Sequence, residues 1–453
     1  MGRKCLTIGI ILLFVGTCII PAIAQNTEKP LPTSSTDWWT MFHHDSEHSG
    51  YSTSFASDTN ATVWVSKVGD DVGFSSPAVV DGRVYICSDY WLSCLDANLG
   101  IRLWRYRVDD YVDTSPAVAD GKVYFGSQNC KVYCLNAKTG VKIWEYTTGD
   151  FILSSPTVVN GKVYIGSSNG KLYCLEAGTG TKIWEYPTGF QIADSPAVSN
   201  GKVYVGSSSG KIYCLDANLG EELWNRSMSG MSSPAIANGK VYCIGYNQNN
   251  GTSDMHCLNA DDGTGLWVQS NLSIMKSSPA VAYGKVYVGS FDKNVYCFNA
   301  DTGVKIWNYT TGDLIWGSAA VADEKVFIGS EDYKVYCLDA NTGEKIWDYT
   351  TGFEVASSPA VADGKVYIGS FDGNVYCFGN QSGVKKAFIF GRYANLTTEG
   401  DNITIEAVNL RMILFKPFEL QHYIAGEKIT FLQNYSRPLI TPRFIIGRVY
   451  VVI

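Results

Sequence analysis

Short runs of alternating apolar and polar residues recur along most of this chain, separated by turn-forming residues. Residues 154–184, SSPTVVNGKVYIGSSNGKLYCLEAGTGTKIW, contain four such runs, PTVV, KVYIGS, KLYCLEA and KIW, divided by NG, SNG and GTG. Alternation of this kind between turn signals predicts four short β-strands in each unit. None of the units has apolar residues at helical spacing, so the pattern predicts an all-β chain.

The four-strand unit is repeated eight times. A Ser-Pro-Ala element marks the copies, mostly 40 residues apart, at Pro77, Pro116, Pro156, Pro196, Pro234, Pro279, Ala319 (in place of proline) and Pro359. A repeat of this length with four strands per unit predicts an eight-bladed β-propeller.

The ends of the repeat region complement each other. Eight tryptophans lie in register near the end of a unit: Trp64, Trp104, Trp144, Trp184, Trp224, Trp267, Trp307 and Trp347. The first belongs to a strand, residues 62–68, with no unit before it, whereas the last unit has Ala387 at the tryptophan position. We therefore expect the N-terminal strand to complete the eighth blade, giving a closed propeller over residues 62–388 without a free edge.

The repeats resemble those of pyrroloquinoline-quinone-type propellers. The docking signature of that family, Ala-x-Thr-Gly-x-x-x-Trp, is intact in AKTGVKIW (137–144), ADTGVKIW (300–307) and ANTGEKIW (340–347). The resemblance implies that the tryptophans pack between neighbouring blades. The family includes quinoprotein alcohol dehydrogenases, the propeller lipoprotein of the outer-membrane β-barrel assembly machinery and secreted propellers of no known activity, and the fold alone does not choose between them.

Three other segments flank the propeller. Residues 1–24 have the charge, apolar run and small-residue pattern of a signal peptide, with an uncleaved membrane anchor as the alternative. Residues 25–61 contain DWWTMFHHDSEHSGYS (37–52), which we expect to form a clasp over the ring, and residues 389–453 predict a small β-rich appendage. We expect a secreted, cell-surface or periplasmic protein of the envelope; nine Asn-x-Ser/Thr sequons are compatible with a glycoprotein, at Asn60, Asn225, Asn250, Asn271, Asn308, Asn380, Asn395, Asn402 and Asn434.

Candidate chemistry is sparse. The formal net charge of −7 argues against a nucleic-acid partner. The resemblance implies that a quinone would rest on a vicinal disulfide, with calcium held by Glu, Asn and Asp, but no two cysteines are adjacent in this chain. We therefore expect no PQQ, no calcium and no catalytic residue, with a PQQ- and calcium-dependent oxidoreductase as the alternative. Glycan cleavage by acids such as Asp113 and Asp194 is a third reading.

The HHDSEH segment is the one candidate metal cluster. His43, His44, Asp45, Glu47 and His48 supply ligand types, but the neighbouring glycine and serines favour a solvated clasp, so no metal is expected.

Two sets of loops vary between the repeats and should share one face of the ring. Rigid scaffolds place binding residues on such loops. The expected lining is aromatic and acidic and suits a glycan or a protein ligand, unless the rings fill the funnel as core: Tyr90, Trp91, Tyr111, Asp113, Phe151, Phe190, Asp194, Trp316, Phe353 and Glu354.

Eight of the thirteen cysteines occupy one repeat position, where we expect small apolar core residues. In the fifth unit, Cys243 and Cys257 align with positions expected to face each other across a hairpin. This alignment predicts a disulfide at the base of an enlarged loop, with two reduced thiols as the alternative.

Overall fold

The computed structural model describes residues 37–379, except 229–231, 248–250 and 274–276, together with the strands between residues 386 and 452. The expected signal peptide therefore lies outside the described residues. These described parts form strands and turns without a helix. A search of them for a helix capable of crossing a membrane finds none.

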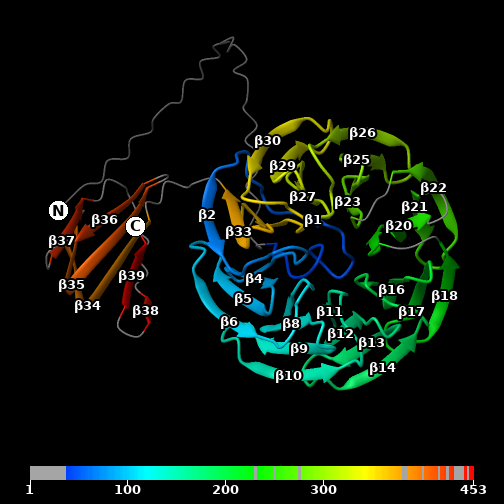
Figure 1. Cartoon of the computed structure of the whole chain (residues 1–453), viewed down its shortest axis with the longest axis horizontal. Helices are drawn as coiled ribbons and strands as arrows, with labels where there is room; N and C mark the ends of the chain where they lie inside the picture. The colour runs from blue at the N-terminus through cyan, green and yellow to red at the C-terminus, as the bar shows by residue number, and fades with distance from the viewer. Residues whose placement is uncertain are drawn as a thin grey trace, which may run out of the picture. The chain divides into compact units, whose positions relative to one another are not determined.

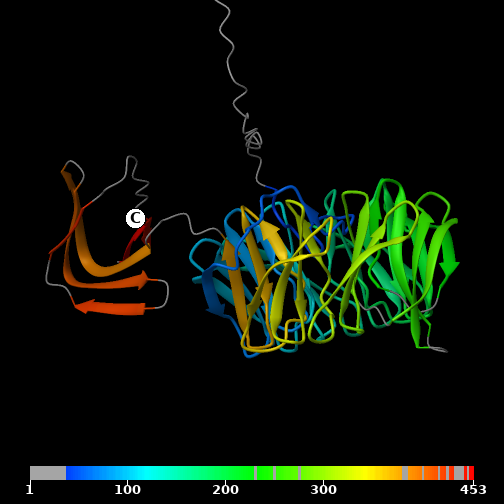
Figure 2. The same ribbon diagram turned by 90° about the horizontal axis from the view of Figure 1, so that it is seen from above.

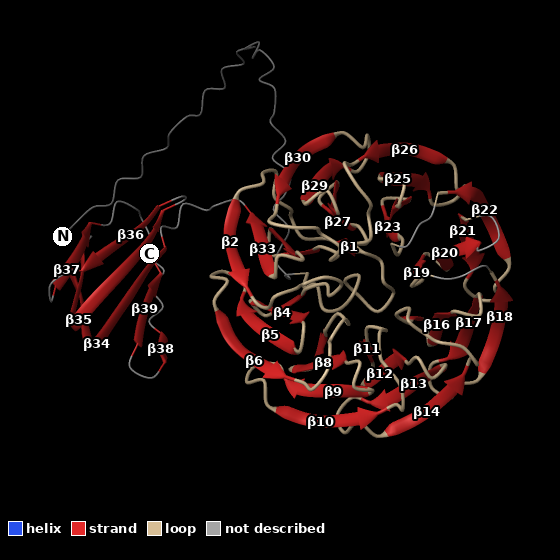
Figure 3. Cartoon of the chain, in the orientation of Figure 1, coloured by secondary structure: helices blue, strands red, loops and turns tan. Residues whose placement is uncertain are grey.

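Eight blades of four antiparallel strands each are arranged in a closed ring, and in the seventh blade a short additional strand, β1 (Tyr51–Ser52), joins the inner edge (Figure 1; Figure 3). Blades 1–4 contain, from the centre outward, β3 (Ala78–Val80), β4 (Arg83–Ser88), β5 (Trp91–Asp96) and β6 (Arg102–Arg107); β7 (Ala117–Ala119), β8 (Lys122–Gly126), β9 (Lys131–Asn136) and β10 (Lys142–Thr147); β11 (Thr157–Val159), β12 (Lys162–Gly166), β13 (Lys171–Glu176) and β14 (Lys182–Pro187); β15 (Ala197–Ser199), β16 (Lys202–Ser207), β17 (Lys211–Asp216) and β18 (Glu222–Ser227).

Blades 5–8 continue the ring. They contain β19 (Ala235–Ala237), β20 (Lys240–Asn247), β21 (Thr252–Asn259) and β22 (Gly265–Leu272); β23 (Ala280–Ala282), β24 (Lys285–Gly289), β25 (Asn294–Asn299) and β26 (Lys305–Thr310); β27 (Ala320–Ala322), β28 (Lys325–Ser330), β29 (Lys334–Asp339) and β30 (Lys345–Thr350); β31 (Ala360–Ala362), β32 (Lys365–Gly369), β33 (Asn374–Gly379) and the N-terminal strand β2 (Thr62–Lys67).

Strand β2 closes the eighth blade, as the sequence predicts. It pairs antiparallel with β33, and the register places Trp64 opposite Cys377 and Lys67 opposite Asn374. Two segments more than 300 residues apart therefore share one sheet. The propeller strands end at Gly379, and the expected boundary at residue 388 lies inside β34 (Lys386–Glu399) of a different sheet.

The eight tryptophans join neighbouring blades through hydrogen bonds. Each indole Nε1 donates to a backbone carbonyl of the next blade at 3.0–3.3 Å, and in seven cases the acceptor is the alanine that opens the turn between the third and fourth strands: Ala97, Ala137, Ala177, Ala217, Ala260, Ala300 and Ala340. The glycine three residues later has a positive φ, and a Cβ on Gly100 would lie 2.6 Å from the Trp64 ring. The Ala-x-Thr-Gly signature is therefore the socket for the indole of the preceding blade.

The eighth blade has no such turn, because β33 and β2 are not consecutive in the chain. The segment that leads into β2 takes its place: Trp347 Nε1 donates to the Ser57 carbonyl at 3.3 Å. In other blades a second-strand tyrosine hydroxyl shares the alanine carbonyl, as Tyr85 does with Ala137 at 3.1 Å. The equivalent residue of blade 7 is Phe327, which has no hydroxyl group and so cannot donate this hydrogen bond.

The lead-in from residue 37 to 52 makes one circuit of the central channel. Its carbonyls accept hydrogen bonds from the innermost strands of six blades in ring order, from Trp39, Thr40, Ser46, Glu47, Ser49 and Gly50 to the amides of Val79, Val118, Val198, Ile236, Val281 and Val321 at 2.6–2.8 Å. Strand β1 (Tyr51–Ser52) then pairs in parallel with β27. We call residues 37–52 the strap. A Cβ on Gly50 would lie 2.7 Å from that of Ala280, so the close approach requires glycine.

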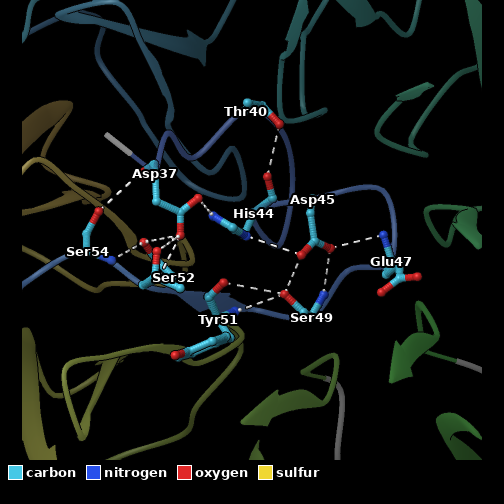
Figure 4. Close-up of polar contacts among 10 residues, drawn as sticks. Asp37, Thr40, His44, Asp45, Glu47, Ser49, Tyr51, Ser52 and Ser54 are labelled. Atoms are coloured by element: carbon cyan, nitrogen blue, oxygen red, sulfur yellow. Dashed lines mark hydrogen bonds and ion pairs between the residues drawn. The ribbon is translucent and has the colours of Figure 1, made fainter. Parts of the chain in front are cut away.

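The HHDSEH cluster holds the strap together (Figure 4). His44 lies between Asp37, at 3.0 Å, and Asp45, at 3.2 Å, and these carboxylates raise its pKa to about 9 against the opposing effect of burial. Asp45 also accepts from Ser49 Oγ at 2.6 Å. His43 and His48 are buried, each with a lowered pKa because of burial. The expectation of a solvated clasp is wrong for the three histidines, which are buried, whereas Asp45 and Glu47 remain partly exposed.

The predicted disulfide between Cys243 and Cys257 is also wrong. Both residues are free thiols, and the register pairs Cys243 with His256 and Tyr242 with Cys257. The sequence alignment placed the pairing one residue off, and a shift of one residue moves a side chain to the opposite face of the sheet. Consistent with this, Cys243 packs with Tyr204 and Cys257 with Val286, on the two sides of blade 5.

Strands β34 (Lys386–Glu399), β35 (Asn402–Lys416), β36 (Glu419–Ile424), β37 (Lys428–Leu432), β38 (Arg443–Ile445) and β39 (Arg448–Val452) form a second sheet. Its strand order is β36-β35-β34-β39-β38, with β37 also paired to β35. The β-rich appendage expected after the propeller is thus a sheet of its own.

Candidate binding face

Two sets of loops lie at the same end of the blades, which stand side by side in the disc (Figure 2). They are the loops from the fourth strand of one blade to the first strand of the next, and the central hairpins between second and third strands. Antiparallel order places both sets at one end, and we call this end the variable-loop face. The loop between blades 1 and 2 is bonded to the hairpin on either side: Tyr90 O accepts from Val108 N, and Tyr111 O from Gln128 N, both at 2.9 Å. The loops that carry Phe151, Phe190 and Phe353 are held in the same way.

The Ser-Ser-Pro-Ala element builds the wall below this face. The hydroxyl of its first serine accepts a second-strand amide, as Ser154 Oγ does from Gly166 N at 3.1 Å. The second serine links blades, because its amide donates to the same serine of the next blade: Ser76 to Ser115, Ser115 to Ser155, Ser155 to Ser195 and Ser195 to Ser233. These bonds hold the bases of the loops in a rigid ring.

Five loops each present one aromatic ring to solvent. The exposed fractions are 53% for Phe74, 46% for Tyr111, 49% for Phe151, 60% for Phe190 and 45% for Phe353. Side chains that filled the funnel as core would be buried. The alternative of a plugged funnel therefore does not hold for these rings.

Some of these rings meet neighbours from the hairpins. Tyr90 lies against Tyr111 with ring centroids 4.6 Å apart, and Tyr333 stacks on Phe353 at 5.3 Å. Trp316, half-buried, contacts Phe291 at 4.4 Å and Phe74 at 6.0 Å. The sequence analysis did not single out Phe74, Phe291 or Tyr333, although all three lie in the two variable loop sets.

The remaining predicted residues are dispersed. Trp91 begins β5 and packs under Arg105 of the outermost strand, with the guanidinium 3.9 Å from the ring centroid. Asp194 stands half-buried at the position of the first serine of its blade, and Glu354, also half-buried, accepts from Phe371 N through its backbone carbonyl at 2.9 Å. Asp113 accepts a hydrogen bond from Gln128 Nε2.

A group of three carboxylates lies at the corner of blades 1 and 2. Burial, together with the nearby charges of Asp89 and Asp113, raises the pKa of Asp71 to about 6. Asp89 Oδ2 accepts from Asp70 N at 2.8 Å. Among the described residues, no set of three or more His, Cys, Asp or Glu side chains is arranged to hold a metal ion.

The family model described as outer membrane protein assembly factor BamB matches residues 88–254, 168–313 and 248–415, which together exceed half of the chain. The chain belongs to the PQQ-repeat β-propeller family. No curated protein matches its sequence.

Solved structures share the fold of this PQQ-repeat propeller at low sequence identity. BamB from Moraxella catarrhalis is 20% identical, with a TM-score of 0.61 over 70% of this chain and 99% of that one. A europium-containing methanol dehydrogenase is 15% identical, with a TM-score of 0.64 over 76% and 98%. The quinohemoprotein alcohol dehydrogenase of Comamonas testosteroni is 16% identical, with a TM-score of 0.62 over 76% and 80%. At these identities the likeness is one of fold.

Proposed function

We propose that this protein is an exported, non-catalytic binding scaffold that holds a protein partner on the variable-loop face. The observation that carries the proposal is the set of half-exposed rings on loops whose backbones are bonded to the hairpins on both sides. Exposed aromatic side chains supply large contact area at interfaces. A backbone already held in place loses little conformational entropy on binding.

The family supports a protein partner more than a glycan. The description of the matching family model names an assembly factor of the outer membrane, and assembly factors contact other proteins. An envelope location fits the expected signal peptide. The free thiols buried at the repeat positions are compatible with it, because they act as apolar core residues and need neither an oxidising nor a reducing environment. A glycan ligand is the alternative, and the array experiment below distinguishes it from a protein ligand.

The alternative of a quinone-dependent oxidoreductase finds less support. No two cysteines are adjacent, so the chain offers no vicinal disulfide on which the ring could rest, and the described residues offer no cluster for calcium. We accordingly propose that the protein binds neither PQQ nor calcium. Dye-linked alcohol oxidation after incubation with PQQ and calcium would contradict this proposal and favour the oxidoreductase alternative.

The binding face is tested with Phe151→Ala and Phe190→Ala on peptide and glycan arrays. Both rings are about half-exposed, so their loss should leave the melting temperature within about 1–2 °C while weakening array binding at least tenfold, since surface substitutions cost little stability. Val141→Ala and Leu219→Ala are matched controls, because these side chains are 64% and 65% exposed on turns at the opposite end of the blades. Equal binding by all four variants would show that this face carries no ligand.

A further inference from the structure

The corner of the variable-loop face between blades 8, 1 and 2 has an inserted residue. Thirteen positions separate Trp64 from Pro77, whereas twelve separate the tryptophan from the next proline or its replacement in six of the other seven loops. The ordinary loops have one residue between the buried aliphatic and the first serine, as Leu153 lies between Ile152 and Ser154. This loop has two, Gly73 and Phe74, so its backbone follows a different path.

The insertion leaves two buried polar atoms without partners. In five other blades the serine at the end of the second strand donates its hydroxyl to a carbonyl of the preceding loop at 3.0–3.2 Å: Ser127, Ser167, Ser207, Ser330 and Ser370. Ser88 occupies the same position and is 2% exposed, but its Oγ has no hydrogen-bond partner among the described residues, and neither has Asp71 Oδ1. A buried hydroxyl or carboxylate oxygen left unpaired is unfavourable, so a hydrogen-bond donor that reached either atom would stabilise it.

The same corner concentrates negative charge. A Cβ placed on Gly69 would lie 2.7 Å from Ser88 Oγ and 2.4 Å from Asp89 Oδ2, so these two side chains converge on one point of the loop. Asp71 is close enough to Asp89 and Asp113 for their charges to disfavour its ionised form. Among the described residues, no lysine or arginine forms an ion pair with any of the three carboxylates.

Acidic turns at the opposite end of the blades differ in this respect. There, lysines at the start of second strands pair with nearby carboxylates, as Lys202 does with Asp261 and Lys240 with Asp301, at 2.7 and 2.5 Å. The connecting loops and hairpins of the variable-loop face contain fourteen acidic and two basic residues, a balance of −12 in a chain of net −7. Charge that the fold leaves uncompensated on one face is available to a partner of opposite sign.

We propose that this corner receives a lysine or arginine side chain of the protein partner, held by Asp71, Asp89, Asp113 and the Ser88 hydroxyl beside the neighbouring rings of Tyr90 and Tyr111. This inference rests on the proposed function and names the chemistry of the partner. An ammonium or guanidinium group brings several N–H donors for the oxygen atoms that lack one. The neighbouring tyrosine faces add a cation–π contact.

The test measures binding of a blocked hexalysine peptide to the full chain by fluorescence anisotropy, at low and at physiological salt. The triple variant Asp71→Asn, Asp89→Asn, Asp113→Asn is compared with Asp81→Asn, Asp120→Asn, Asp363→Asn, which removes the same charge from the opposite end. The control is conservative because Asn160, Asn200 and Asn238 already occupy the equivalent positive-φ sites in blades 3–5. A hexaserine peptide serves as the uncharged probe.

We expect the first triple variant to bind hexalysine at least tenfold more weakly than the parent, with an unchanged or higher melting temperature, and the control to stay within twofold. Equal losses in both variants would mean bulk charge attraction and overturn the proposal, as would a parent that does not bind hexalysine. A third outcome separates the two proposals. If Phe190→Ala weakens array binding but the triple variant binds hexalysine as the parent does, this inference is refuted and the proposed function is not.

Discussion

Asp71 shows how one residue can be costly for folding and useful on the surface. Burial of its carboxyl group raises its pKa to about 6, and the charges of Asp89 in the first hairpin and Asp113 in the next connecting loop add to this rise. The folded chain therefore binds this proton more tightly than the unfolded chain does.

The sign of the pH effect follows from this difference. Between pH 4 and pH 6 the folded state holds more protons, so the contribution of Asp71 to the free energy of unfolding falls as the pH rises, and the full penalty applies above pH 6. We expect Asp71→Asn to be more stable than the parent by ~1 kcal/mol at pH 7, once solvent screening is allowed for, and equally stable near pH 4. Urea unfolding at both pH values measures this, and a parent-like variant at pH 7 would contradict the assignment.

Among the elements, β2 has an importance beyond its length. It supplies the outermost strand of blade 8 and the indole of Trp64, which donates to Ala97 of blade 1 at 3.0 Å. Without it, β33 becomes an unpaired edge and the socket on blade 1 is empty. A raw edge invites pairing with another chain.

Deleting residues 62–68 should accordingly destabilise the whole ring and promote aggregation. Trp64→Ala tests the indole alone and should cost about 3–5 kcal/mol, because a large side chain is lost from a packed site. Size-exclusion chromatography and chemical unfolding are the measurements, with deletion of seven residues from 25–31 as the control. A monomeric deletion variant with the stability of the parent would disprove closure by β2.

At the scale of the whole molecule, the strap distributes its hydrogen bonds unevenly around the ring. Amide groups of six innermost strands donate hydrogen bonds to strap carbonyls. Among the described residues, the amides of Val158 in blade 3 and Val361 in blade 8 make no such bond. His48 Nε2 instead meets Thr157 Oγ1 in blade 3 at 3.1 Å. The strap therefore acts as a lining for one end of the channel and leaves closure to β2.

A chain that starts at residue 56 separates these two roles, because it keeps Ser57 and β2 but lacks the strap. We expect it to fold with a lower melting temperature, and its amides at Val79, Val118, Val198, Ile236, Val281 and Val321 to exchange hydrogen faster. Val158 and Val361 should change little, since they lose no strap carbonyl. Hydrogen exchange resolved by residue decides the matter, and uniform loss of protection would show that the ring itself needs the strap.

Local sequence determined the blades, their number and the closing strand. Alternating residues and Asn-Gly turns specify strands through contacts within about 40 residues, and the unmatched Trp64 and Ala387 revealed the exchange because both are deviations from a repeated pattern. The alanine and glycine of the docking signature could be recognised for the same reason. The strand and socket signals report on their own unit or on the next one, whereas the exchange was visible because the two ends of the repeat region complement each other.

Only the tertiary structure decided what depends on neighbours far apart in the chain. The register that separates Cys243 from Cys257, the burial of His43 and His48 inside the channel, and the outward position of Trp91 all follow from how blades and strap pack. The corner of Asp71, Ser88, Asp89 and Asp113 arises where three loops meet, and its unpaired oxygen atoms lie beside a loop that has one inserted residue. The sequence shows which residues are present and how far apart they lie in the chain. Whether a buried polar atom finds a hydrogen-bond partner depends on which groups the folded chain brings within reach.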